Sequence, residues 1–287
     1  MIQEIGNKKM DNQFKADVCP GEDDFVFIFV KAQHGPDEIY LGGSEEDKIR
    51  IPKRKDLDVK EDDLVYLFSI DEDKYYMAKP GIEIEVPEGF APKSNRVLRK
   101  TEPKHHSFAA MTACHLNTWY NNNQYCGKCG TKTKYGINER HMKCPECGNV
   151  IYPRINPAVT VALIHDDKLL VTKYRGRAQT NMYALIAGFV EIGESTEECV
   201  AREVMEEVGL KVKNIKYYGS QPWGFAGNLQ IGFWAEVDGS AEITMDENEL
   251  STAFFISREE LEPNDNRPAL TQEMIEEFRI GNTFSTL

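Results

Sequence analysis

Two pairs of cysteines place the strongest constraint on how this chain of 287 residues can fold. Cys126 and Cys129 are separated by two residues, fourteen residues follow, and Cys144 and Cys147 repeat the spacing. A glycine follows each pair and lets backbone amides approach the sulfur atoms. Four thiolates at this spacing predict a tetrahedral, structural zinc ion on a β-hairpin, with no coordination position left for catalysis. The alternative, a redox dithiol, normally needs one such pair rather than two.

The other three cysteines, Cys19, Cys114 and Cys199, are isolated, and the total of seven is odd. This argues against a disulfide framework. The N-terminus lacks the apolar core of an export signal, and no apolar run approaches the roughly 20 residues that a membrane span needs. We therefore expect a cytoplasmic protein with no membrane partner.

The formal net charge is −13. Such a chain is poorly suited to long, non-specific contact with a nucleic acid backbone. It suits a protein that binds divalent cations through carboxylates, although acidic surfaces also serve solubility alone.

The hydrophobic pattern predicts three parts. They are an N-terminal β-rich domain with a linker (1–104), a helix plus the zinc ribbon (105–153), and a C-terminal domain (154–287). In the first part we expect a frayed start over residues 1 to about 22, short strands from Phe25 to about Val86, and a connection over 87–104. In the second part, helical spacing predicts a helix over 108–120.

The C-terminal part has alternating strand and helix signals. Two strands meet at a turn at Asp166 and Asp167, and a loop over 175–196 leads to a helix from about Thr196 to Val208, which Gly209 ends. Strands then continue through residues 211–220 and 231–238. A final helix over about 268–279 completes the predicted α+β architecture.

The helix that begins near Thr196 is rich in glutamate. Glu203 and Glu207 are four positions apart and share one face, and Glu206 lies at its edge. Val200, Val204 and Val208 form the opposite, apolar stripe, while Arg202 is placed to pair with Glu194. Clustered like charges destabilise a helix unless a cation offsets them. The spacing alone therefore leaves two interpretations, a Mg²⁺-type site for cleaving a phosphoanhydride or a solvated acidic face.

The residues around this helix decide between the two interpretations, because the segment resembles the signature of the Nudix hydrolases. The matching positions are Gly188, Glu194, Arg202, Glu203, Val204, Glu206, Glu207, Gly209 and Leu210. The resemblance implies an α/β/α sandwich with a mixed sheet and catalysis by Mg²⁺ or Mn²⁺. It implies that Glu203 and Glu207 bind metal with the carbonyl of Ala187, that Glu206 is a further ligand or a base, and that Glu249 is a later ligand.

Features outside the helix resemble the NADH pyrophosphatase branch of that family, in which a zinc ribbon precedes the Nudix domain. Tyr152 to Pro157 resembles a junction of that branch. The run from Ser220 to Asn228, SQPWGFAGN, resembles its substrate motif SQPWPFPxS. Gly224 and Ala226 replace two prolines and Asn228 replaces the closing serine, which loosens the predicted loop and leaves broader dinucleotide use open.

The branch resemblance also implies a set of substrate-binding residues. The candidates are Arg99 (with Arg96 as the alternative), Glu139, Tyr152, Phe189, Gln221, Pro222, Trp223, Gly224, Phe225, Ala226, Gly227, Asn228 and Thr271. The aromatic members suit stacking on the flat bases of a dinucleotide, although each one alone is equally suited to packing in the core. Homodimers with shared sites are implied as well.

These observations predict hydrolysis of NAD(H) to NMN(H) and AMP, and removal of NAD caps from RNA 5′ ends. The alternatives are a broader nucleoside-diphosphate pyrophosphatase acting on ADP-ribose or diadenosine polyphosphates, a non-catalytic nucleotide sensor, and a ribbon that binds nucleic acid through its lysines. Sensors usually lose helix glutamates, and here all of them are present.

Overall fold

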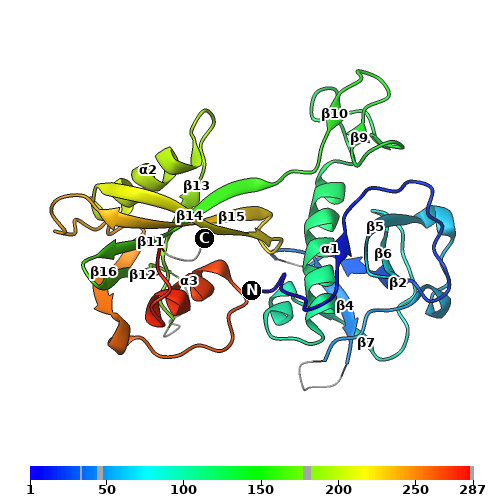
Figure 1. Ribbon diagram of the computed structural model, residues 1–287. Coiled ribbons are helices and arrows are strands. Elements are labelled where there is room, and N and C mark those ends of the chain that lie inside the picture. The colour runs from blue at the N-terminus through cyan, green and yellow to red at the C-terminus, as the bar shows by residue number, and fades with distance from the viewer. Residues whose placement is uncertain (33, 44–47, 177–181, 285–287) are drawn as a thin grey trace. The chain divides into compact units, whose positions relative to one another are not determined.

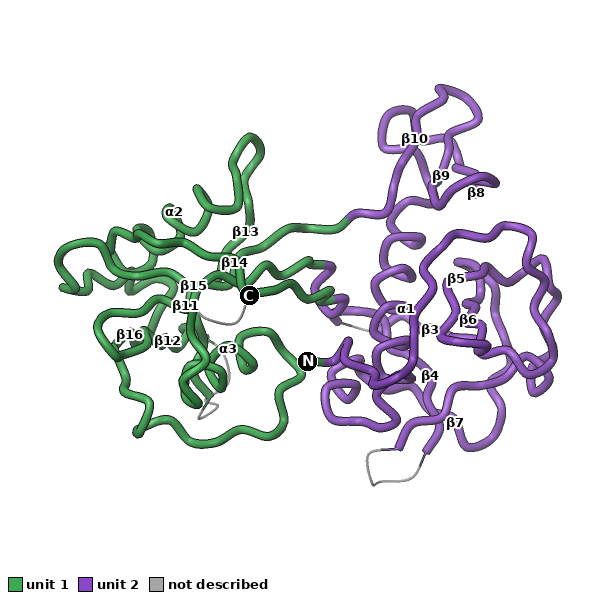
Figure 2. Tube along the Cα trace, in the orientation of Figure 1, with its two compact units in different colours: residues 1, 155–223, 228–287 green, residues 2–154, 224–227 purple. Residues whose placement is uncertain are grey.

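The computed structural model describes residues 1–32, 34–43, 48–176 and 182–284 of the chain (Figure 1). The chain forms two compact units (Figure 2). The N-terminal unit comprises residues 2–154 and 224–227, and the C-terminal unit comprises residue 1, 155–223 and 228–287. The finer division at residues 104 and 153 stays a proposal. Within the described residues, no helix has both the length and the apolar character needed to cross a membrane.

Short strands build most of the N-terminal unit. They are β1 (Met10–Asp11), β2 (Phe25–Phe27), β3 (Phe29–Val30), β4 (Glu38–Gly42), β5 (Leu64–Ile70), β6 (Asp73–Ala78), β7 (Phe90–Lys93), β8 (Lys134–Tyr135), β9 (Met142–Lys143) and β10 (Val150–Ile151). The described strands pair in the orders β1-β5-β6-β2, β3-β4-β7 and β10-β9-β8. The predicted β-rich domain and ribbon hairpin are therefore present.

Within the region of predicted short strands, the run FVFIFV breaks at Ile28, and its halves, β2 and β3, join different sheets. Two details of the N-terminal prediction were wrong. The start of the chain is not wholly frayed, since β1 pairs with β5. The expected connection over 87–104 contains strand β7 and the 3-10 helix η3 (Asn95–Arg99). Each of the strands concerned pairs with a strand far from it in the sequence, and no local sequence pattern indicates such a pairing.

Helix α1 (Lys104–Asn122) covers the predicted helix over 108–120 and extends it at both ends. Phe108, Met111 and Trp119 are buried, as their helical spacing indicated. Short 3-10 helices also occur at η1 (Arg54–Asp56) and η2 (Glu61–Asp63).

A mixed sheet forms the centre of the C-terminal unit. Its strands are β11 (Asn156–His165), β12 (Lys168–Tyr174), β13 (Ile186–Phe189), β14 (Val212–Trp223), β15 (Asn228–Val237) and β16 (Leu250–Ser257). The order is β14-β15-β11-β12-β16, with β13 paired to β11, and β11 runs parallel to β15 while the other described pairs are antiparallel. The turn between β11 and β12 lies where Asp166 and Asp167 predicted it.

Helices α2 (Thr196–Val208) and α3 (Leu270–Arg279) cover opposite faces of this sheet (Figure 1). Alternating residues of β11 supply the two cores: Val159 and Val161 pack with α2, whereas Ala162 packs with α3. The result is the expected α/β/α sandwich, and η4 (Arg258–Glu260) follows β16. The predicted loop over 175–196 contains β13, and its residues 177–181 lie outside the described part of the chain.

Helix α2 has the predicted bounds because both ends carry local stop signals. Ser195 and Glu198 form a capping box at its start, and Gly209 takes a left-handed conformation (φ 69°) at its end. Val200, Val204 and Val208 are fully buried, which fixes the helix against the sheet and determines where its glutamates lie.

Candidate functional site

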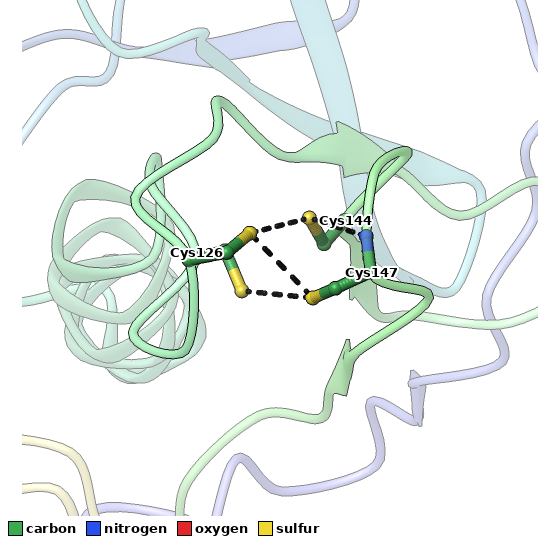
Figure 3. Close-up of side chains that lie close together, drawn as sticks. Cys126, Cys144 and Cys147 are labelled. Atoms are coloured by element: carbon green, nitrogen blue, oxygen red, sulfur yellow. Dashed lines mark hydrogen bonds between the residues drawn. The ribbon is translucent and has the colours of Figure 1, made fainter.

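The four predicted zinc ligands are gathered in the ribbon of the N-terminal unit. Their ligand atoms all lie within 4.8 Å of one another. The Sγ atoms of Cys129 and Cys144 are 3.4 Å apart, and those of Cys126 and Cys147 are 3.6 Å apart (Figure 3). Tetrahedral ligands at a Zn–S distance of about 2.3 Å lie roughly 3.8 Å from one another. The four-cysteine cluster therefore fits a structural zinc ion.

Backbone amides support the ribbon thiolates. The N–H of Lys128 donates to Cys126 Sγ at 3.4 Å, and the N–H of Cys147 donates to Cys144 Sγ at 3.5 Å. Donation by Lys128 lowers the pKa of the Cys126 thiol to about 6, which favours the thiolate that a metal binds. The glycines after the pairs, Gly130 and Gly148, both have positive φ, so they are needed where the knuckles turn.

In the C-terminal unit, two glutamates of α2, Glu203 and Glu207, lie against strand β13. Glu207 is only 2% exposed. The carboxyl group of Glu203 lies directly over Gly188, since a Cβ added to that glycine would be 1.9 Å from Glu203 Cδ. Only glycine fits at position 188 of the signature, because a methyl group there would displace the Glu203 carboxylate. Glu206 remains largely exposed at the edge of the face.

Arg202 connects the glutamates of the segment. Its guanidinium donates to Glu194, at 2.7 and 2.9 Å, and also to Glu203 at 2.7 Å and Glu206 at 2.9 Å. A further bond, 2.9 Å long, reaches the carbonyl of Phe189. Donation by Arg202 lowers the pKa of Glu194 to about 2. The predicted pairing of Arg202 with Glu194 is confirmed, and it holds the loop before α2 against the helix.

Burial raises the pKa of Glu207 to about 8 and that of Glu203 above its usual range. The charges of other carboxylates raise both pKa values further: Glu206 acts on Glu203, Glu203 acts on Glu207, and Glu249 acts on both. Clustered, buried carboxylates of this kind are hard oxygen ligands in need of a cation. The donor set therefore fits a divalent metal, as the Nudix resemblance implied.

This carboxylate group is more open than the ribbon cluster. Among the described residues, only the cysteines form a group of three or more acidic, His or Cys side chains with all ligand atoms within 4.8 Å of one another. Mg²⁺-type ions usually keep several waters and share their coordination with substrate phosphates. A cation beside Glu203 and Glu207 would take its other ligands in that way and from the carbonyl of Ala187.

The motif SQPWGFAGN is the end of a β-hairpin rather than a loop. Strand β14 continues through Trp223, and β15 begins at Asn228. Gln221 is fully buried, and its side chain bonds to the backbone on either side of Ala269. Pro222 is exposed and Trp223 is half-buried. The side-chain carbonyl oxygen of Asn228 is buried, and no protein donor to it occurs within the described chain.

The tip of this hairpin, residues 224–227, belongs to the N-terminal unit. A Cβ at Gly224 would lie 2.7 Å from the carbonyl oxygen of Met111 in α1. The absence of a side chain at Gly224 therefore allows close packing against α1, and the predicted loosening of the backbone stays a prediction. Ala226 is exposed and Gly227 has a positive φ, which completes the turn.

The remaining candidates of the N-terminal unit form two contacts. The guanidinium carbon of Arg99 lies 5.0 Å from the centre of the Phe225 ring, a cation–π arrangement that favours Arg99 over Arg96. The hydroxyl of Tyr152 donates to Glu139 at 2.9 Å. These four separately predicted candidates thus form two contacting pairs within the unit.

Two further candidates lie in the C-terminal unit. Phe189 is 53% exposed at the end of β13, and Thr271 is the second residue of α3. Exposure leaves the Phe189 ring free to stack on a flat group, whereas Thr271 is partly buried. The roles of all these side chains stay predictions.

Sequence reasoning missed Tyr174. Its hydroxyl lies 3.3 Å from Glu207 Oε1 and 3.4 Å from Oε2. Alternation along β12 was the available signal, since it places Leu170 and Tyr174 on the same face of the sheet as α2.

A cavity of about 310 Å³ also lies within the N-terminal unit, lined by side chains such as Tyr66, Tyr120 and Tyr135. None of the predicted site residues lines it.

Two family models match this chain. Residues 154–278 match the NUDIX domain, and residues 121–152 match the NADH pyrophosphatase zinc ribbon domain. With the sandwich and the glutamate helix described above, the first match shows that the chain contains a Nudix domain. More particularly, this domain follows the zinc ribbon domain that is named for NADH pyrophosphatase.

Two curated relatives carry the same name. The "NAD-capped RNA hydrolase NudC" of Pseudomonas aeruginosa is 40% identical over 164 residues, which are 57% of this chain and 58% of that protein. The protein of that name from Photobacterium profundum is 38% identical over 168 residues, 58% of this chain and 62% of that protein. The matched region thus spans about three fifths of these relatives.

One solved structure is also similar, a NUDIX hydrolase from Nitrosomonas europaea. It is 18% identical, and the match covers 55% of this chain and 90% of that chain with a TM-score of 0.45.

Proposed function

We propose that this protein hydrolyses the pyrophosphate of NAD(H), giving NMN(H) and AMP, and removes NAD caps from RNA 5′ ends. The observation that carries the proposal is the group of carboxylates on α2, in which Glu207 is buried beside Glu203. The charge of Glu249, outside the helix, raises the pKa of Glu207 further. A buried cluster of like charges costs stability unless a cation offsets it. Such a cluster is better explained by a metal site for phosphate chemistry than by a solvated helix face.

The proposed chemistry assigns distinct tasks to the residues of the site. A bound Mg²⁺ or Mn²⁺ supplies charge stabilisation for the phosphate oxygens and lowers the pKa of water. Glu203 and Glu207, with the carbonyl of Ala187, hold the cation, and Glu249 adds negative charge nearby. Glu206 is largely exposed, and although its Oε2 is bonded to Arg202, its Oε1 is the candidate to accept a proton from the attacking water. Arg202 keeps Glu203 and Glu206 in place through one guanidinium nitrogen.

The substrate assignment rests on the relatives and on the hairpin motif. Both relatives cited above are named for NAD-capped RNA, and the ribbon model is named for NADH pyrophosphatase. Trp223, Phe225, Phe189 and Tyr152 offer aromatic faces for the two bases of a dinucleotide. Arg99, held over the ring of Phe225, adds a positive charge suited to a phosphate.

The proposal also covers the oligomeric state of the protein and its location in the cell. We expect a homodimer in which the predicted ribbon residues Glu139 and Tyr152 serve a shared site. The ribbon thiolates need a reducing environment to bind zinc, so we expect a cytoplasmic protein. The net charge of −13 restricts contact with capped RNA to its first few nucleotides.

A panel of substrates tests the function. We expect kcat/KM to be highest for NADH or NAD-capped RNA in the presence of Mg²⁺ or Mn²⁺, and lower for ADP-ribose. Glu207→Gln should reduce turnover at least about 100-fold, because a neutral amide binds a hard cation poorly. Glu242→Gln, which changes an exposed glutamate of the same unit, should leave turnover unchanged. Equal turnover by Glu207→Gln and the wild type would disprove the metal assignment.

One observation favours a broader pyrophosphatase as the second candidate. Ala226 stands in place of a motif proline and is exposed at the hairpin tip, where its backbone is less restricted. A tip of this kind accommodates different groups beyond the pyrophosphate. If ADP-ribose or a diadenosine polyphosphate gives a kcat/KM as high as that of NADH, this second function replaces the first.

A further inference from the structure

Tyr174, at the end of strand β12, contacts the most deeply buried glutamate of α2. Its hydroxyl oxygen is 3.3 and 3.4 Å from the two carboxylate oxygens of Glu207. The same hydroxyl is 3.4 Å from the carbonyl oxygen of Leu185, just before β13. A single tyrosine hydroxyl thus lies among oxygen atoms from a helix and from the segment that leads into a neighbouring strand.

The local sequence accounts for this position. Leu170 and Tyr174 alternate onto the face of the sheet that packs against α2. The pairing of β12 with β16 shifts register between Lys173 and Tyr174, so that Tyr174 lies opposite Leu250. The next residue, Arg175, donates its N–H to the carbonyl of Glu249 at 2.8 Å. The register shift at the end of β12 therefore brings Tyr174 next to the backbone of Glu249.

The hydrogen bonds of the α2 glutamates differ in kind. Arg202, a permanent cation, donates to Glu194, Glu203 and Glu206. Glu207 receives a neutral donor instead, the hydroxyl of Tyr174. A neutral donor orients a carboxylate and offsets part of its desolvation without cancelling its charge. When the Glu207 carboxyl group loses its proton to bind a divalent cation, Tyr174 therefore orients it without offsetting its charge.

We propose that Tyr174 is a positioning residue that holds the Glu207 carboxylate ready to bind the catalytic divalent cation. The inference rests on the metal site of the proposed function and adds a residue to it. Groups that hydrogen-bond to metal ligands fix their orientation, and losing one typically weakens metal affinity by about 10- to 100-fold. Tyr174 acts through Glu207 and need not touch the substrate.

Mn²⁺ binding to the zinc-loaded, substrate-free protein tests this role. The variant Tyr174→Phe removes one hydroxyl and keeps the ring packed. Titration calorimetry should give a Kd for Mn²⁺ about 10-fold weaker than that of the wild type. The matched control is Tyr217→Phe, because Tyr217 is 46% exposed on β14 and its ring packs on Phe233. This control should bind Mn²⁺ as the wild type does.

Either of two outcomes would overturn the inference. In the first, Tyr174→Phe binds Mn²⁺ within about twofold of the wild type, and in the second, both variants weaken binding equally. Thermal unfolding of the metal-free proteins accompanies the titration, so that a folding defect is recognised separately. Failure of the wild type to cleave any dinucleotide would disprove the proposed function, whereas the Mn²⁺ titration reports on Tyr174 in either case.

Discussion

Gln221 and Leu270 are joined by a buried hydrogen bond of 2.7 Å between the side-chain carbonyl of the glutamine and the backbone N–H of the leucine. The other end of the same amide donates to the carbonyl of Pro268 at 2.8 Å. One side chain of the hairpin motif therefore fixes the start of α3, where Thr271 lies. Gln221 serves the site by placing this helix, and its contact with substrate stays a prediction.

Replacing Gln221 should therefore destabilise the C-terminal unit. Gln221→Ala leaves the N–H of Leu270 and the carbonyl of Pro268 unsatisfied, at a cost of about 3 kcal/mol in the free energy of unfolding. Hydrogen exchange of amides in α3, read together with urea unfolding, measures the loss. Gln13→Ala changes an exposed glutamine and should stay within about 0.5 kcal/mol of the wild type. Unchanged exchange in α3 would show that the two bonds do not hold the helix.

Gly188→Ala should damage the metal site far more than the fold. The new Cβ would lie about 2 Å from the carboxyl group of Glu203, and that flexible side chain would swing away rather than disrupt the sheet. We expect Mn²⁺ to bind at least about 10-fold more weakly, with little change in the unfolding temperature. Gly219→Ala is the control, because a Cβ there meets nothing within 4 Å. Equal Mn²⁺ affinity in the two variants would contradict the steric argument.

Local signals explain which parts of this structure were predictable from sequence. The bounds of α2 follow from its capping box and Gly209, and the ribbon follows from cysteine spacing. Strands β13 and β16 were missed because each pairs with a strand far from it in the sequence, β13 with β11 and β16 with β12. The extension of β14 through Pro222 was also missed, since proline usually ends a strand. Here β14 is an edge strand, where a missing N–H costs little.

The candidate site likewise has one part that local sequence patterns predicted and one part that depends on distant contacts. The spacing of Glu203 and Glu207 predicted one shared face, which α2 provides. The contact between Tyr174 and Glu207 joins a strand to a helix 33 residues away, and it depends on the register of β12 within the sheet. Such a contact cannot be predicted from sequence spacing, because it requires the strand order and register of the folded sheet.

The purified protein should contain one zinc ion per chain, bound by the ribbon. Cys144 is fully buried among the other three sulfurs, so Cys144→Ser should abolish zinc retention, which elemental analysis measures. Proteolysis should then cleave within residues 124–151, because the β8–β9–β10 hairpin has little core of its own. Cys19→Ser alters an exposed cysteine outside the cluster and should retain full zinc. Full zinc content in Cys144→Ser would refute the assignment of Cys144 as a zinc ligand.

His106 should make the stability of the N-terminal unit depend on pH. Burial, and next the charge of His105, lower its pKa to about 4, while Asp73 opposes the shift and Lys8 adds to it. The ring packs edge-on against Phe25 at 5.0 Å, and its Nδ1 has no hydrogen-bond partner within the described chain. The folded protein therefore binds this proton less readily than the unfolded chain does.

Because the folded pKa lies below the unfolded value of about 6.5, the contribution of His106 to stability is complete above pH 6.5 and is lost as the pH falls to about 4. At 1.36 kcal/mol per pKa unit, and discounted for partial exposure, the loss is about 2 kcal/mol. Urea unfolding at pH 4.5 and 7 should show a smaller pH-dependent loss for His106→Gln than for the wild type. His34→Gln, at an exposed histidine, should keep the wild-type profile. If His106→Gln loses as much stability between the two pH values as the wild type, the buried histidine is not the group that titrates.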